Sequence, residues 1–456
     1  MDPKTFLDQN KQTRLDELFE FLRFPSVSAK SENKKDILAC ADWLKDHIIN
    51  KLGIETKVMP TAGHPVVYGE KISSPDKLTV LYYGHYDVQP PEPLELWKTE
   101  PFNPIIDGDY IIARGATDDK GQLLTHIKAL EAYHATGTEL PINVKLLIEG
   151  EEESGAENLA NFVKENADML KADIVVISDS SQFARNKPAV TYGLRGVTSV
   201  EVKITGPDRD LHSGGFGGAV PNPINVLAKI VASMHDDDGK VLIDGFYDNV
   251  LPVSDWEREQ FTKLPFDKDD YLSKVGSKGL HGEKGYSVYE QTWARPTLDV
   301  NGITGGYQGE GGKTIIPSWA SAKITMRLVP NQESDEIAEK LEKHILKVCP
   351  DYVECEIMKH GGAAAVIVPT EGPWLKAAGK AIKEGFGIEP VFTREGGSIP
   401  IVGTFKKVLG LDTLLLGWGQ NDDNAHSPNE RFSVDDFHRG CYAGLALIEE
   451  MAGVKI

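Results

Sequence analysis

Residues 78–87 read LTVLYYGHYD, an apolar and aromatic run that ends in a glycine, a histidine and an acid. A short run of this kind is typical of a buried β-strand. His85 and Asp87 stand two positions apart on an extended segment, so their side chains share one side of it. The segment therefore predicts a strand of a buried sheet with polar, chemically useful side chains at its carboxyl end.

Apolar runs and helical patterns alternate on the carboxyl side of this strand and again near the end of the chain. The expected segments are strands at residues 144–148, 174–177 and 413–416 and helices from about 122, over 158–164, and from about 374 and 434. Strands that alternate with helices indicate an α/β fold with a mostly parallel sheet flanked by helices.

A different pattern begins at Gly193, and a chain of 456 residues exceeds the size at which one core keeps growing. Apolar residues alternate with polar ones at 200–204, as in a half-exposed antiparallel strand. The later segments complete the order β-α-β-β-α-β of a ferredoxin-like unit. They are a helix at 224–234, strands near 298, over 322–328 and near 353, and a helix at 337–348.

We therefore predict an inserted α+β domain at residues 193–360. The α/β domain is predicted to consist of residues 1–192 and 361–456. Residues 236–296 show no clear period, so the sequence leaves their structure open.

Composition excludes several classes of partner. The formal net charge of −20 argues against nucleic acid, because affinity for phosphates depends on clustered Lys and Arg. The polar residues 1–14 lack the apolar core of a signal peptide, and no apolar run has the length of a membrane span. The four cysteines form no C-x-x-C pair, which favours reduced structural thiols. We expect a cytoplasmic protein that binds neither nucleic acid nor membrane.

Five polar motifs follow strands of the α/β domain or stand between a strand and a helix. They are GHYD (84–87), ATDDKG (116–121), EGEEESG (149–155), SDS (178–180) and DDNAHS (422–427). Ligands bind open α/β sheets at the carboxyl ends of the strands, so these distant motifs are expected to converge. Imidazoles and carboxylates without thiolates suit zinc or manganese. The candidate ligands are His85, Asp118, Glu153, Asp179 and His426.

Each motif taken singly also has a plainer interpretation. His85 could be a loop histidine beside a solvated acid, and the acids at 151–153 could be a solvated run. Asp118 could cap the helix that follows it. Asp179 and His426 could be an ordinary loop acid and an ordinary polar histidine. Only the complete set favours a metal site.

The charges of the candidate ligands favour two metal ions over one. Two divalent ions bring four positive charges, and Asp118, Glu153 and Asp179 with a hydroxide return four negative ones. Asp119 could then cap the helix while Asp118 bridges the two ions. An acid next to Glu153 that binds no metal could take a proton from water.

In this order the motifs resemble the metallopeptidase family that includes aminoacylases, glutamate carboxypeptidases, succinyl-diaminopimelate desuccinylase and the carnosinases. The cytosolic nonspecific dipeptidases are the most similar branch, and the resemblance covers nearly the whole chain. It implies a zinc-exopeptidase-like catalytic domain with an inserted lid and dimerisation domain. It also implies two divalent ions per subunit, with Zn²⁺ as the first choice and Mn²⁺ or Co²⁺ as alternatives.

The resemblance also assigns roles to the residues of the α/β domain. One metal would be held by His85, Asp118 and Asp179, and the other by Asp118, Glu153 and His426. Glu152 would match the general base and Asp87 the acid that supports His85. A cis peptide bond is implied between Asp118 and Asp119.

Further motifs resemble the same dipeptidase branch. They are TYGLRG (191–196), DLHSG (210–214), KTIIP (313–317), RLVP (327–330) and GGSIP (396–400). The resemblance implies that His212 reaches across a homodimer to polarise the scissile carbonyl. The substrate carboxylate would be held by Thr314, Arg327 and Ser398, with Gly397 beside them. Without the resemblance, His212 could be a mobile loop residue and Arg327 a solvated residue on an outer face.

The implied reaction is hydrolysis of dipeptides or small peptides with a free carboxyl terminus. An N-acyl amino acid deacylase would use the same site, and a catalytically silent peptide-binding homologue would keep the same residues. A P-loop NTPase is excluded because Tyr307 stands where the motif needs glycine. A serine-hydrolase elbow is excluded because Pro400 replaces its second glycine. The native metal and the preferred peptide stay open.

Overall fold

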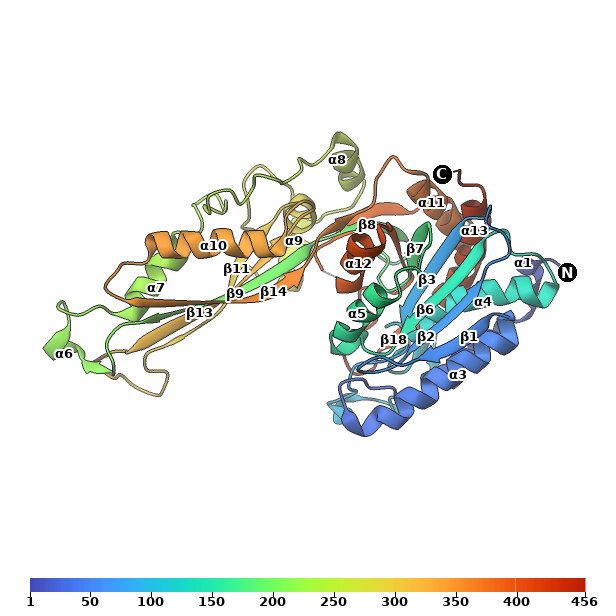
Figure 1. Ribbon diagram of the computed structural model, residues 1–456, viewed down its shortest axis with the longest axis horizontal. Coiled ribbons are helices and arrows are strands. Elements are labelled where there is room, and N and C mark those ends of the chain that lie inside the picture. The colour runs from blue at the N-terminus through green and yellow to red at the C-terminus, as the bar shows by residue number, and fades with distance from the viewer. Residues whose placement is uncertain (398, 456) are drawn as a thin grey trace. The chain divides into compact units, whose positions relative to one another are not determined.

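The computed structural model describes residues 1–397 and 399–455. Two compact units are formed, and both chain ends belong to the first (Figure 1). The first unit comprises Met1–Tyr192, Val368–Thr393 and Thr404–Ile456, and the second comprises Gly193–Ile367 and Arg394–Gly403. Among the described residues, no helix is both long enough and apolar enough to cross a membrane.

The first unit is built on a sheet with the strand order β1-β2-β6-β3-β7-β17-β8. The strands are β1 (Glu55–Met59), β2 (Val66–Lys71), β3 (Thr79–His85), β6 (Asn143–Glu149), β7 (Ile174–Ile177), β8 (Ala189–Leu194) and β17 (Thr413–Gly417). The central strands β6, β3, β7 and β17 are parallel, and β1, β2 and β8 pair in antiparallel fashion. The predicted mostly parallel sheet is confirmed.

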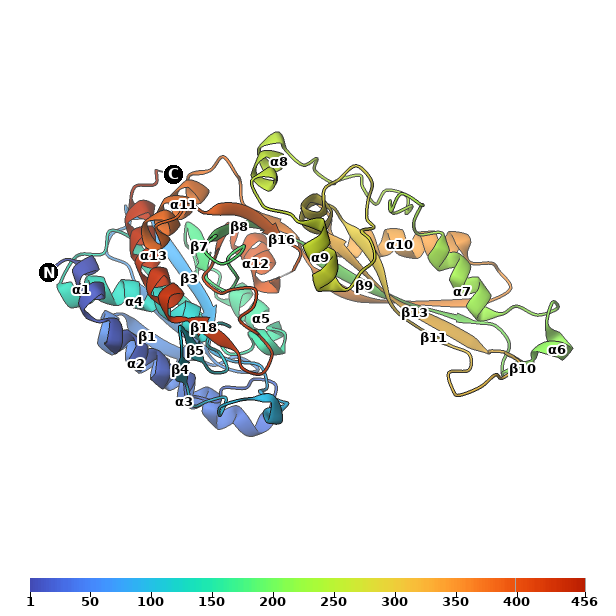
Figure 2. The same cartoon turned by 180° about the vertical axis from the view of Figure 1, so that it is seen from behind.

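Helices cover this sheet and complete the α/β fold. α3 (Lys34–Leu52) packs on β1 and β2, and α4 (Lys120–Thr136) packs on β3. α13 (Val434–Ala452) packs against both α4 and α11 (Pro373–Phe386), as Figure 2 shows from behind. Every residue of α4 from Lys120 to Tyr133 is buried, so the helix lies inside the unit. The other helices of this unit are α1 (Pro3–Gln9), α2 (Lys11–Leu22) and α5 (Glu157–Glu165), with short helical turns at Ser31–Asn33, Leu94–Leu96, Glu152–Ser154 and Phe405–Leu409. α12 (Pro400–Thr404) lies almost entirely in the second unit.

The parallel strands all end at one edge of the sheet. β3 ends at His85, β6 at Glu149, β7 at Ile177 and β17 at Gly417. A small antiparallel sheet brings two further segments of the chain together. Its strands are β4 (Ile105–Asp107), β5 (Tyr110–Ile112) and β18 (Arg431–Ser433). Its β18–β5 pairing brings the chain that follows His426 alongside the chain that precedes Asp118.

The second unit contains an antiparallel sheet with the strand order β11-β13-β9-β14. Its strands are β9 (Gly196–Thr205), β11 (Thr297–Gly305), β13 (Trp319–Leu328) and β14 (Glu354–Ala363). Buried and half-buried residues alternate along β9, and α7 (Pro223–Ala232) and α10 (Ser334–Val348) pack on the sheet (Figure 1). The short strands β10 (Leu211–His212) and β12 (Ile315–Ile316) pair with each other, whereas β15 (Val366–Ile367) and β16 (Val391–Glu395) pair with β8 of the larger sheet. The predicted order β-α-β-β-α-β is confirmed.

One boundary of the second unit differs from the prediction, and the segment that the sequence left open contains helices. The expected boundary after residue 360 falls inside β14, because Gly361 has a φ of 72° and the register shifts between Lys359 and Gly362. The glycine pair therefore makes a bulge in the strand and does not end it. The segment without a clear period contains α8 (Asp255–Thr262), α9 (Lys268–Val275) and a π-helical turn at Glu290–Ala294.

Candidate metal centre

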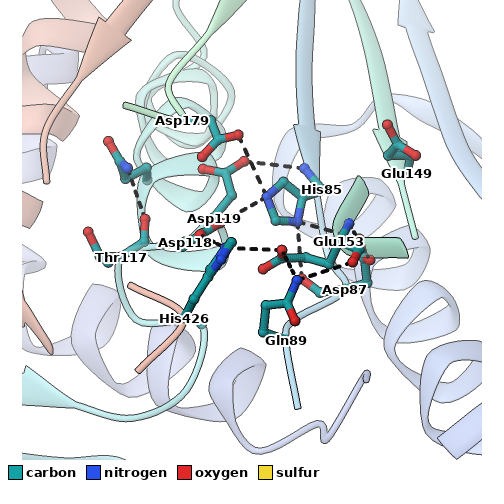
Figure 3. Close-up of polar contacts among 12 residues, drawn as sticks. His85, Asp87, Gln89, Thr117, Asp118, Asp119, Glu149, Glu153, Asp179 and His426 are labelled. Carbon is teal, nitrogen blue, oxygen red and sulfur yellow. Dashed lines mark hydrogen bonds and ion pairs between the residues drawn. The ribbon is translucent and has the colours of Figure 1, made fainter. Parts of the chain in front are cut away.

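Five side chains from five segments of the first unit converge at the carboxyl edge of its sheet (Figure 3). His85 ends β3, and Asp118 stands just before α4. Glu153 lies in the helical turn after β6, Asp179 follows β7, and His426 lies in the loop after β17. The structure thus brings together all five candidate ligands.

Two groups of donor atoms share Asp118. His85 Nε2 lies 3.1 Å from Asp118 Oδ1 and 3.7 Å from Asp179 Oδ2. His426 Nε2 lies 2.9 Å from Asp118 Oδ2 and 3.1 Å from Glu153 Oε2. In each group of three residues, the donor atoms lie within 4.8 Å of one another. Asp118 therefore turns one oxygen to each group, as a bridging carboxylate does.

These separations fit divalent metal ions. Two donors at about 2.1 Å from one tetrahedral zinc ion stand about 3.4 Å apart, close to the observed separations of 2.9 to 3.7 Å. His85 Nε2 is fully buried and makes no well-formed hydrogen bond. A buried polar atom without a partner is costly, and a metal ion would supply the missing partner.

Asp87 orients two of the candidate ligands. His85 Nδ1 lies 3.1 Å from the Asp87 carbonyl oxygen and 3.4 Å from Asp87 Oδ1. With its proton on Nδ1, the ring directs the lone pair of Nε2 towards Asp118. The other carboxylate oxygen of Asp87 accepts a hydrogen bond of 3.1 Å from the Glu153 N–H. Asp87 thus fixes the ring of His85 and the backbone of Glu153.

Gln89 is a member of the site that the sequence did not reveal. Its side-chain amide donates to Glu153 Oε2 at 2.8 Å and to the Glu153 carbonyl oxygen at 3.1 Å (Figure 3). The sequence could have indicated Gln89 through its spacing. It stands two positions after Asp87, as Asp87 does after His85, so on an extended segment the three side chains share one side.

The peptide bond between Asp118 and Asp119 is cis. Asp119 precedes α4, but its carboxylate makes no capping hydrogen bond to that helix. Asp119 Oδ2 accepts a hydrogen bond from the His85 N–H at 3.2 Å. The prediction of Asp119 as a helix cap is therefore wrong, because a backbone donor from β3 takes its carboxylate.

Neighbouring carboxylates stabilise the protonated, positively charged forms of His85 and His426. Hydrogen bonds to Asp118 and Glu153 raise the pKa of His426 to about 10. Burial alone would lower the pKa of His85, but the neighbouring carboxylates of Asp118 and Asp87 raise it well above its ordinary value. Burial and the Asp118 charge raise the pKa of Asp179. The cluster therefore favours cations, which is the electrostatic requirement of a metal centre.

Glu152 stands beside Glu153 but belongs to neither group of donor atoms among the described residues. Its pKa is raised, first by burial and then by the charges of Glu153 and Asp118, although His85 opposes them. A carboxylate with a raised pKa next to a metal centre is suited to accept a proton.

The substrate residues predicted in the second unit form two groups. β10 pairs with β12, and the Ser213 N–H donates to the Thr314 carbonyl oxygen at 3.0 Å, so Thr314 lies beside His212. His212 is exposed, and its Nδ1 accepts a hydrogen bond of 3.0 Å from the Gly214 N–H. A neutral ring in this arrangement carries its proton on Nε2 and can donate it outward.

The second group lies at the other end of β13. Arg327 is half-buried on β13 and pairs with Val197 on β9. Burial and the charge of Arg327 lower the pKa of Arg195 to about 10, and Arg195 donates to the Gly396 carbonyl oxygen at 3.3 Å. Gly397 is exposed next to this segment, and Ser398 lies outside the described residues. Thr314 precedes β13 and Arg327 lies near its far end, and the predicted role of both in binding a substrate carboxylate stays a prediction.

Comparisons with known proteins agree with this geometry. The sequence profile of Peptidase family M20/M25/M40 matches residues 81–450. The Cys-Gly metallodipeptidase DUG1 of Candida albicans is 36% identical over 457 residues, which cover 95% of this chain and 94% of that protein. Human Beta-Ala-His dipeptidase is 33% identical over 400 residues, covering 85% of this chain and 78% of that protein. The crystal structure of the M20 family metallo-carboxypeptidase Sso-CP2 from Sulfolobus solfataricus is similar with a TM-score of 0.84 and 36% identity, covering 97% of this chain and 99% of that one.

Proposed function

Because this chain belongs to Peptidase family M20/M25/M40 and is a metallopeptidase, we propose that its metal centre hydrolyses dipeptides with a free carboxyl terminus. The observation that carries the proposal is Asp118, whose two oxygens face His85 and His426 separately. The names of the similar Cys-Gly and Beta-Ala-His dipeptidases support a dipeptide substrate. Cys-Gly is the first substrate to assay.

The residues of the site fit a pair of divalent ions. His85, Asp118 and Asp179 would hold one ion, and Asp118, Glu153 and His426 the other. Imidazoles and carboxylates favour Zn²⁺, with Mn²⁺ and Co²⁺ as alternatives. When bound, such ions acidify water and polarise the scissile carbonyl.

The chain's own residues carry out the proton transfers and orient the site. Glu152 accepts the proton of the attacking water and returns it to the leaving amine. Asp87 keeps the ring of His85 in one orientation, and Gln89 does the same for the Glu153 carboxylate. Arg327 suits a substrate carboxylate, because a guanidinium can bind both of its oxygens.

A homodimer would complete the substrate site. β13 is 10 residues long, which at ~3.3 Å per residue separates its ends by about 30 Å. A dipeptide extends over only about 7 Å. One subunit therefore cannot place both His212 and Arg327 on the same dipeptide. A two-fold dimer in which the partner's His212 and the partner's Thr314 reach the site removes this conflict.

Hydrolysis assays distinguish a dipeptidase from two alternative functions. An N-acyl amino acid deacylase would use the same centre, so hydrolysis of Cys-Gly is to be compared with hydrolysis of N-acetyl amino acids. A silent peptide-binding homologue would show no turnover, and the retention of Glu152 beside Glu153 argues against it. We also propose a cytoplasmic location, which four cysteines without a disulfide support.

Removal of metal tests the proposal most directly. Chelation should abolish dipeptide hydrolysis, and addition of Zn²⁺, Mn²⁺ or Co²⁺ should restore it, because water is the nucleophile and needs acidification. The measurement is the hydrolysis rate after dialysis against a chelator and after each metal is added. Full activity in protein shown by elemental analysis to be free of metal would disprove the two-metal function.

Metal binding should also release protons. The neighbouring acids raise the pKa of His426 to about 10 and raise that of His85 above its ordinary value, whereas coordination needs both rings neutral. We expect proton release when metal binds and an affinity that weakens as the pH falls. Titration calorimetry in buffers of different ionisation enthalpy measures the release. Binding without proton release would show that the histidines are not the ligands.

A further inference from the structure

Glu430 is a buried acid that the reaction does not use. It stands in the loop that carries His426, just before β18, and its side chain is 0% exposed. A charged group so deeply buried requires partners, because an isolated charge in a protein interior is very costly.

The partners of Glu430 are all donors from the segment that ends at Asp118. Glu430 Oε2 accepts from Arg114 Nη1 at 2.7 Å and from the Gly115 N–H at 3.0 Å. Glu430 Oε1 accepts from the Thr117 N–H at 3.0 Å and from the Asp118 N–H at 3.1 Å. Each oxygen therefore receives two hydrogen bonds, which uses the acceptor capacity of a carboxylate.

This arrangement joins two ligand-bearing segments. Glu430 bonds directly to the backbone of Asp118, the shared member of both donor groups. In the neighbouring position, Asn429 accepts from the Lys98 N–H and donates to the Leu96 carbonyl oxygen, each at 2.8 Å. The loop that carries His426 is thus fixed to two other segments next to Glu430.

A second contact connects the segment that ends at Asp118 with the loop that carries His426. Asp423, also in the loop, accepts a hydrogen bond of 3.3 Å from the Thr117 hydroxyl and one of 2.7 Å from the Gln420 N–H. Arg114, which is 1% exposed, balances the charge of Glu430. The separation between Asp118 and His426 therefore depends on a buried network with Glu430 at its centre.

We propose that Glu430 is a positioning residue of the metal centre. Its carboxylate holds the backbone of Asp118 and the loop of His426 in the relative position that lets Asp118 Oδ2 reach His426 Nε2 at 2.9 Å. The proposal rests on the proposed two-metal function. It predicts that Glu430 controls metal affinity without contacting a metal ion.

Glu430→Gln tests this role with little change of shape. The amide nitrogen cannot accept a hydrogen bond, so two of the four donors lose their acceptor. We expect the affinity for Zn²⁺ to fall roughly 10- to 100-fold, as for other residues that orient metal ligands. Competition between the protein and a chromophoric chelator, with Zn²⁺ alone as the probe, gives the dissociation constants.

Glu257→Gln is the matched control. Glu257 is also a buried glutamate, with an ion pair to Arg394 and a hydrogen bond of 2.9 Å from the Ser254 N–H, but it lies in the second unit. The Glu257→Gln protein should keep the wild-type affinity for Zn²⁺ even if its melting temperature falls. An equal loss of affinity in both variants would overturn the proposal, since general destabilisation would then explain it. Wild-type affinity in Glu430→Gln would also overturn it.

A second measurement and a second variant keep the test independent of folding and of catalysis. Amide hydrogen exchange at Thr117 and Asp118 should speed up in chelated Glu430→Gln, and unchanged exchange would count against the proposal. If that variant does not fold, Glu430→Asp keeps the charge, shortens the reach and should weaken Zn²⁺ binding less severely. Wild-type protein that binds Zn²⁺ but cleaves no dipeptide would refute the proposed function alone. Unchanged affinity in the variants of an active enzyme would refute only the role of Glu430.

Discussion

Replacing Glu152 by glutamine should lower kcat for dipeptide hydrolysis roughly 100- to 10,000-fold, the usual contribution of a general base. Glutamine keeps the shape of the side chain but cannot accept a proton from water. Glu152 is not among the groups of candidate ligands in the described residues, so both metal ions should stay bound. Steady-state kinetics and elemental analysis of the same preparation measure the two expectations.

The neighbouring substitution Glu153→Gln is the matched control. Glu153 Oε2 lies 3.1 Å from His426 Nε2 and accepts from Gln89 at 2.8 Å, so this change should reduce metal occupancy. Excess metal should restore part of its activity, whereas Glu152→Gln should stay inactive at any metal concentration. If Glu152→Gln lost metal as readily as Glu153→Gln, the two roles would have to be exchanged.

The sequence was most informative where candidate metal ligands directly follow strands that are easy to recognise. β3, β6 and β7 are buried along nearly their whole length, so their apolar runs were easily recognised. Because these strands are parallel, the residues that follow them had to meet at one edge. This is why His85 and Asp179 could be placed together without a structure.

Residues whose partners are distant in sequence were harder to assign. Glu430 has all its side-chain partners more than 300 positions away, and no local pattern distinguishes it from a solvated acid. Asp119 fits a helix cap by position alone, but a donor from β3 takes its carboxylate. Local rules consider neighbouring residues only, whereas buried polar groups are satisfied by whichever segment the fold brings near.

The two groups of substrate residues show the same limit on a larger scale. Thr314 and Arg327 stand close in sequence, but Thr314 precedes β13 and Arg327 lies near the far end of that strand. Sequence motifs relate both residues to the same family of enzymes. The length of β13 sets them too far apart for both to contact one dipeptide from the same subunit. The strand geometry is thus the basis for expecting catalysis by a dimer.

Mixing two inactive variants should restore activity if the partner's His212 serves each site. Glu152→Gln and His212→Ala should each be inactive as pure homodimers. In a mixed dimer, one site carries both defects and the other carries neither. With random exchange about half of the dimers are mixed and each has one intact site of two, so activity should approach roughly a quarter of wild type. Kinetics on the unfractionated co-expressed protein measure this recovery, and mixed dimers purified through two affinity tags should reach roughly half of wild type.

Two further pairs make this test specific. Glu152→Gln with Glu153→Gln should give no recovery, because both residues lie in the same turn, Glu152–Ser154, and every site keeps a defect. His212→Ala with Thr314→Ala should also fail, because Thr314 lies beside His212 and both would serve the partner's site. Glu152→Gln with Thr314→Ala should recover if Thr314→Ala alone is impaired. If the mixed dimers of Glu152→Gln and His212→Ala are shown to form and stay inactive, His212 acts within its own subunit or not at all, and the dimeric site is wrong.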